Sequence, residues 1–159
     1  RPKTNVHVEP KTMAKLAQIP NIVGVKDSTG DMTNALEYIR LTEGIPDFTV
    51  IMGRDTLIYS ALESGAGGAI ATCANVAPRL VSDIYDKFTA GDKEGALKAQ
   101  MAIAPLRIAC NNLGTFPAVI KEALVQEGIP VGKCMAPVAE LSDAQKAELH
   151  EILIKMNLL

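Results

Sequence analysis

Three short apolar runs alternate with amphipathic stretches in the first part of the chain. The runs span 21–25, 48–52 and 69–73, and each is partly β-branched and almost continuously apolar. Such runs are typical of parallel strands that are buried on both faces. Helical patterns with capping or starting residues flank the runs, and they begin near Pro10, Asp31, Asp55 and Pro78. Alternating strands and helices predict a parallel α/β sheet with right-handed crossovers.

The pattern changes at Asp92, after which the sequence predicts only helices. They span about 92–113 and 117–127, and a third begins at Ser142, where Ser142-Asp-Ala-Gln145 fits a capping box. Three strands with helices on one side leave the other face bare, so we expect either a doubly wound sheet or part of a (β/α)8 barrel.

The length favours a partial barrel. A full barrel needs about 250 residues, whereas this chain has 159 and opens without an initiating methionine. We therefore expect the C-terminal part of a TIM barrel. Residues 1–91 form about three βα units in this interpretation, and residues 92–159 form a helical C-terminal extension.

Charge and composition exclude several classes of partner. Sixteen basic residues against eighteen acidic residues give a net charge of −2, which provides no electrostatic argument for nucleic acid or an anionic membrane. The apolar runs are too short to span a bilayer. Three widely spaced cysteines without a CxxC pair predict free thiols in a reducing compartment, hence a cytoplasmic protein. His7 and His150 lie far apart, so we predict no metal site.

We expect the candidate functional residues where the strands end, because active and binding sites in parallel α/β folds lie there. Lys26 closes the first run, and burial lowers a lysine's pKa and so favours a nucleophilic neutral amine. The alternative is a lysine at the sheet rim that reaches water or pairs with Asp27 or Asp31. Asp27 and Asp55 are more typical of turn anchors than of acid/base groups. Gly53 either allows a close approach or is an ordinary turn glycine.

These residues also carry a family resemblance. The segment Gly24-Val-Lys26-Asp-Ser-Thr-Gly-Asp31 resembles the Schiff-base lysine motif of the dihydrodipicolinate synthase/N-acetylneuraminate lyase family. Further segments follow in the family's order, and the resemblance covers nearly the whole chain: Gly53-Arg-Asp55, Gly65-Ala-Gly-Gly-Ala-Ile70, Ala74-Asn75-Val, Pro117-Ala-Val-Ile-Lys121 and Ala136-Pro137.

The resemblance implies a class I, pyruvate-handling lyase or synthase on a TIM barrel, without a cofactor or metal. Lys26 is implied as the Schiff-base residue, Ile70 as a lining residue of the pyruvate pocket, and Gly53 as its neighbour. Arg1 or Lys3 is implied to bind the carboxylate of a second substrate. The favoured second substrate is aspartate semialdehyde, as in lysine biosynthesis, and the implied partners are small molecules and further copies of the chain.

The resemblance also leaves alternatives open. Asp27-Ser28-Thr29 stands where many synthases carry Glu-Ala-Thr or Glu-Ala-Ser, which leaves room for an N-acetylneuraminate lyase-like or 2-keto-3-deoxy sugar acid aldolase. The family's carboxylate-binding Gly-Thr-Thr loop and its proton-relaying tyrosine precede the matching region. A non-catalytic half-barrel that pairs with a missing N-terminal half is therefore a further hypothesis, and we expect this chain alone to be inactive.

Overall fold

The computed structural model describes residues 6–159, and its contacts divide the chain into two compact units. Unit 1 is Arg1–Ala71 and unit 2 is Thr72–Leu159. The sequence predicts a different division, at residue 91, between βα units of a barrel and a helical extension. The contact-based units do not test that division, and it stays a prediction. Each unit is described by itself below.

Unit 1 contains a three-stranded parallel sheet in the order β1-β2-β3. Its elements are α1 (Pro10–Leu16), β1 (Gly24–Asp27), α2 (Met32–Thr42), β2 (Thr49–Met52), η1 (Asp55–Leu57), α3 (Ile58–Glu63) and β3 (Gly68–Ala69). The order alternates strands and helices as the sequence predicts. The Asp31 carboxylate caps α2 by accepting the Thr33 backbone N–H at 2.9 Å. Gly44, with φ +75°, follows the end of α2.

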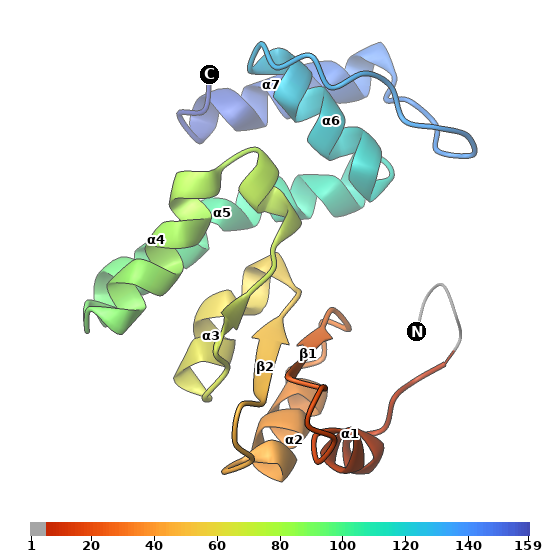
Figure 1. The fold of residues 1–159 in the computed structure, drawn as a ribbon. Coiled ribbons are helices and arrows are strands. Elements are labelled where there is room, and N and C mark those ends of the chain that lie inside the picture. Colours follow the sequence, from red (N-terminus) through yellow and green to blue (C-terminus); the bar gives the residue numbers. More distant parts are fainter. Residues whose placement is uncertain (1–5) are drawn as a thin grey trace. The chain divides into compact units, whose positions relative to one another are not determined.

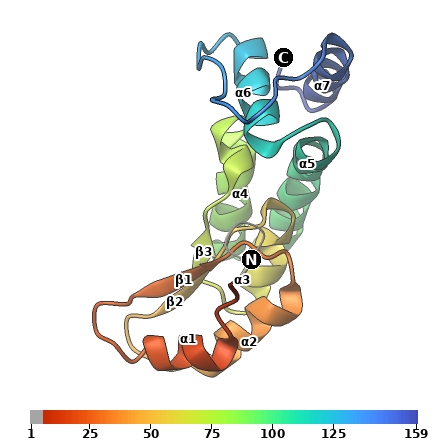
Figure 2. The same ribbon diagram turned by 90° about the vertical axis from the view of Figure 1, so that its right-hand side faces the viewer.

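Helices cover one face of this sheet. Figure 2 shows α1 and α2 on the same side of β1 and β2. Along β2, Val50 and Met52 are buried, whereas Thr49 is exposed and Ile51 is half-buried. Val50 packs in a core with Met13 of α1 and Tyr38 of α2. We call the other side, which carries Lys26 and Ile51, the open face.

The open face corrects two predictions. The expectation of strands buried on both faces is wrong for the described residues, because α1 and α2 lie on a single side. A doubly wound sheet, with helices on both sides, is not seen in residues 6–159 for the same reason.

The third strand is shorter than predicted. It spans only Gly68–Ala69, and Cys73 lies instead in η2 (Thr72–Asn75). The ladder continues as far as the bond from the Ile70 N–H to the Met52 carbonyl, at 2.9 Å. Beyond Met52 the chain turns into η1, so no backbone remains to pair with 71–73.

Unit 2 is helical. After η2 it contains α4 (Pro78–Thr89), α5 (Lys93–Asn112), α6 (Phe116–Gln126) and α7 (Asp143–Lys155). Figure 1 shows α4 and α5 side by side. Their buried side chains include Ile84 and Ile103, and each fully buried aliphatic side chain contributes about 1.5–3 kcal/mol. The predicted capping box is confirmed, because Ser142 and Gln145 each bond the other's backbone N–H.

Candidate functional site

The candidate site lies in unit 1, where the three parallel strands end. The register pairs Lys26 of β1 with Ile51 of β2 and Asp27 with Met52. Gly53 and Ile70 come directly after β2 and β3. Because side chains alternate along a strand, Lys26 and Ser28 lie on the open face, whereas Asp27 lies on the helix-covered face.

Lys26 is exposed on the open face. The sequence predicts that Lys26 is buried and that burial activates its amine. Residues 6–159 do not bury Lys26, because the packed helices lie on the other side of the sheet. The position itself, near the carboxyl end of β1, agrees with the prediction. The Lys26 side chain lies outside the helix-covered core and is accessible to a molecule that binds at this edge of the sheet.

Gly53 lies directly beneath the Lys26 side chain. A Cβ atom added to Gly53 would stand 2.8 Å from Lys26 Cε and 2.9 Å from the Asp27 carbonyl oxygen, and it would also collide with Ser28 Oγ. The Gly53 N–H donates to the Asp27 carbonyl at 2.6 Å. Gly53 is thus a position of close approach, which is one of the two interpretations that the sequence allows.

Asp27 anchors the turn after β1. It is 3% exposed, and its two carboxylate oxygens accept bonds from the Thr29 N–H at 2.8 Å and from Asn34 Nδ2 at 2.9 Å. The first bond closes the turn after Lys26, and the second ties this turn to α2. The carboxylate points away from the open face, so the turn-anchor interpretation is confirmed. Sequence reasoning missed Asn34, although its place three residues after the Asp31 cap sets it in the first turn of α2, facing the sheet.

Ile70 and Ser28 flank Gly53 on the open face. Ile70 is 57% exposed, which is unusual for a large apolar side chain at a strand end. Ser28 lies two residues beyond Lys26 and therefore points to the same side. The structure thus brings together an amine, a hydroxyl, an apolar side chain and an open glycine backbone.

A cavity of about 260 Å³ lies along β1 beside Lys26. Its lining residues are Val6, His7, Val8, Met13, Val25, Lys26, Asp27, Ser28, Thr29 and Tyr38. The Tyr38 hydroxyl donates to the Val8 carbonyl and so fixes the segment before α1 at one wall. This gives the strand end a partly apolar recess next to an amine.

Two predicted site residues, Arg1 and Lys3, lie outside the described residues. Within 6–159, the structure contains no group of three His, Cys, Asp or Glu side chains that could hold a metal ion. In the same part of the chain, no helix is both long and apolar enough to cross a membrane.

Comparison with known proteins decides the family. The model of the Dihydrodipicolinate synthetase family matches residues 1–156. The chain belongs to this family. It is 34% identical over 155 residues to the 4-hydroxy-tetrahydrodipicolinate synthase of Methanothrix thermoacetophila, covering 98% of this chain and 52% of that protein. The chain spans about half the length of the curated relatives it matches.

Solved structures of the family share the fold. The dihydrodipicolinate synthase of Thermotoga maritima matches with a TM-score of 0.92 and 28% identity, over 98% of this chain and 53% of that one. A prophage protein of E. coli K12, solved in complex with pyruvate, matches with a TM-score of 0.88 and 28% identity. The match covers 96% of this chain and 52% of the prophage protein.

Proposed function

We propose that this chain is the C-terminal half of a pyruvate-handling TIM-barrel lyase and that Lys26 forms its Schiff base. Lys26 extends over Gly53 at the carboxyl edge of a parallel sheet, in a chain that belongs to the dihydrodipicolinate synthetase family. That single juxtaposition carries the proposal. The prophage protein's complex with pyruvate supports the choice of keto acid.

The proposed reaction begins when the neutral Lys26 amine attacks the carbonyl carbon of pyruvate. Water leaves as the imine forms, and the protonated imine withdraws electrons from the neighbouring methyl group. Loss of a methyl proton gives an enamine, whose carbon attacks the aldehyde carbon of the second substrate while the aldehyde oxygen takes up a proton. Hydrolysis then releases Lys26. Ile70 and the Gly53 backbone would form the wall beside the keto acid.

Aspartate semialdehyde is the proposed second substrate, since relatives that match 95–98% of the chain are named 4-hydroxy-tetrahydrodipicolinate synthase. The full protein would then be a cytoplasmic enzyme of small molecules, without a cofactor and assembled from several copies. The 159-residue chain alone would be inactive, because the residues that hold the pyruvate carboxylate and relay protons are assigned by the resemblance to the other half.

Trapping with borohydride tests the Schiff base. The chain and the full-length polypeptide that contains it are incubated with pyruvate, reduced, and mapped by peptide mass spectrometry, with acetate as the control. We expect one pyruvate adduct on Lys26 in the full-length protein. The adduct should be absent in Lys26→Arg, which keeps the charge, and retained in Lys15→Arg, which alters a lysine of α1.

Adducts spread evenly over several lysines would contradict the proposal, as would no adduct in the full-length protein. The latter result would favour the non-catalytic half-barrel.

A second candidate, a sugar-acid aldolase, is favoured by Ser28. Its hydroxyl lies beside Gly53 on the open face, where many synthases carry alanine, and it can bond a hydroxyl of a longer substrate. If the enzyme acts on a 2-keto-3-deoxy sugar acid, Ser28→Ala should lower kcat/KM for that substrate by about tenfold, equivalent to one hydrogen bond of about 1.4 kcal/mol. The enamine step, measured by exchange of pyruvate methyl protons, should be unchanged. An equal loss of both would identify Ser28 as a structural residue.

A further inference from the structure

Unit 2 contains a cavity that the proposed function does not use. It has a volume of about 260 Å³, room for about eight water molecules. Its walls come from α6, from the irregular segment 129–142 and from the start of α7. Three of its lining residues are apolar, Ala118, Val125 and Leu141, and three are cationic, Lys121, Lys133 and Lys146.

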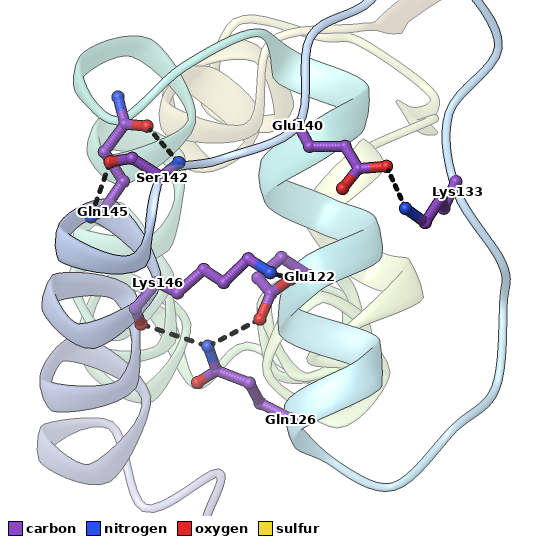
Figure 3. Close-up of polar contacts among 7 residues, drawn as sticks. All are labelled: Glu122, Gln126, Lys133, Glu140, Ser142, Gln145 and Lys146. Carbon is purple, nitrogen blue, oxygen red and sulfur yellow. Dashed lines mark hydrogen bonds and ion pairs between the residues drawn. The ribbon is translucent and has the colours of Figure 1, made fainter.

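The cavity is held in shape by a polar network between α6 and α7, drawn in Figure 3. Gln126 Nε2 donates to Glu122 Oε1 and to the Lys146 carbonyl, both at 3.1 Å. Gln126 Oε1 meets His150 Nδ1 at 3.1 Å. The contacts of Gln126 with Lys146 and His150 tie the two helices together on one side of the cavity, so the space is formed before any ligand enters.

Two of the three lysines are already paired with carboxylates. Lys133 Nζ lies 2.9 Å from Glu140, and the Lys146 side chain reaches from α7 to α6, where its Nζ lies 3.7 Å from Glu122 (Figure 3). Each of these charges is therefore compensated at the cavity wall.

Lys121 differs because its partners are neutral. Its Nζ donates to the Lys133 carbonyl at 2.9 Å and contacts the Val131 carbonyl at 3.4 Å. Among residues 6–159, no carboxylate lies within ion-pair distance of it. An ammonium carries three N–H donors, so one direction remains after these two carbonyls. A half-buried cation without a counter-ion gains from an anion, and a bond from it to a carboxylate is charge-assisted.

The rest of the lining defines the body of the ligand. Ala118, Val125 and Leu141 favour a short hydrocarbon part, and the volume excludes a nucleotide or a long chain. We propose that this cavity binds a small carboxylic acid with a short apolar body, the carboxylate at Lys121 and the hydrocarbon between α6 and Leu141. This proposal rests only on unit 2 and is independent of Lys26.

Cys134 provides a direct measurement, because it lines the cavity and is half-buried, whereas Cys73 and Cys110 are buried. The rate at which N-ethylmaleimide alkylates Cys134 is followed by peptide mass spectrometry in the 159-residue chain. Butyrate is the probe, and chloride keeps the ionic strength constant. We expect saturable protection with a Kd of about 1 mM. Protection should reach about tenfold at about nine times Kd.

Matched probes and variants separate charge, apolar body and cavity. Butyramide has the same shape without charge, and inorganic phosphate has charge without the apolar body, so neither should protect. Lys121→Met should abolish protection by butyrate. Lys155→Met removes an exposed cation from α7, outside the cavity lining, and it should leave protection within about twofold of the native chain.

Equal protection by butyrate and butyramide would overturn the role of Lys121, and equal protection by phosphate would overturn the role of the apolar wall. Absence of protection up to about 10 mM butyrate would overturn the site itself. If Lys121→Met fails to fold, the comparison of butyrate with butyramide on the native chain still tests whether the site requires a charged carboxylate. Shifts of the Val125 and Leu141 methyl resonances with butyrate give a second measurement, and unchanged resonances would contradict the proposal.

Discussion

Gly53 is the residue whose identity the site geometry constrains most. Gly53→Ala places a methyl group 2.8 Å from Lys26 Cε and 2.9 Å from the Asp27 carbonyl. A flexible lysine side chain can move aside, but the backbone of the neighbouring strand cannot do so without cost. We expect the full-length variant to lose pyruvate trapping at Lys26 by at least about tenfold and to unfold about 1–3 kcal/mol more easily. Borohydride trapping and urea titration measure the two effects.

Gly68→Ala is the matched control, because it adds the same methyl group to a neighbouring strand of the sheet. A Cβ at Gly68 would meet only Ile51 Cδ1, at 3.8 Å, which is ordinary van der Waals contact. We expect trapping close to that of the native protein. If Gly53→Ala traps pyruvate as well as Gly68→Ala does, the close approach at Gly53 has no role in the chemistry.

The position of Lys26 could be predicted from the sequence, but its surroundings could not. A charged residue at the end of an apolar run is visible as a pattern, as is the open backbone of Gly53. The exposure of Lys26 depends on which face of the sheet α1 and α2 cover, and that packing is not visible in a local sequence pattern. Lys121 was visible only as part of the segment 117–121 that resembles the family, and nothing in the local sequence indicated its cavity in unit 2.

The exposed ion pair between Lys133 and Glu140 stabilises the segment 129–142, and this stabilisation depends on pH. The hydrogen bond from Lys133 lowers the pKa of Glu140 below its ordinary value of 4.5, and the same bond raises the pKa of Lys133. Since the folded-state pKa of Glu140 is lowered, its contribution is complete above the ordinary value and disappears as the pH falls through the lowered one. The Lys133 contribution disappears as the pH rises above the ordinary lysine range.

Glu140→Gln should therefore weaken the segment at neutral pH and have no effect in acid. Hydrogen exchange of the amides around Lys133, corrected for the intrinsic rate at each pH, measures this. We expect faster exchange in the variant at pH 7 and equal exchange well below pH 4.5. Glu37→Gln breaks a comparable exposed pair with Arg40 in unit 1 and serves as the control. A difference that persists unchanged into acid would contradict the electrostatic explanation.

Most element types could be predicted because their signals are local. Pro10, Asp31, Pro78 and the Ser142 capping box each begin a helix at or within a residue of the observed start. The third strand could not be predicted in length. Residues 69–73 are apolar enough to form a strand, but a strand also needs a partner, and β2 ends at Met52. Strand pairing depends on the neighbouring strand, so the composition of residues 69–73 alone did not reveal where β3 ends.

The open face of unit 1 is the feature of the whole molecule that most needs a partner. Ile51 and the 57% exposed Ile70 lie on it, and β1 and β3 are both edge strands among the described residues. Unpaired edges and exposed apolar side chains favour association with another chain. The chain spans about half of each matched relative's length, and under the proposed function the other half of a barrel would cover this face.

The 159-residue chain should therefore self-associate when it is produced alone. Sedimentation velocity from about 1 to 100 μM is expected to show species larger than a monomer that increase with concentration. Ile70→Lys places a charge on the open face and should shift the distribution toward the monomer. Met101→Lys makes the same kind of change on α5, at a side chain that is 66% exposed, and should leave the distribution as in the native chain. A monodisperse monomer over the whole range would contradict the prediction. An equal response to both variants would place the association surface outside the open face, because only Ile70 lies on it.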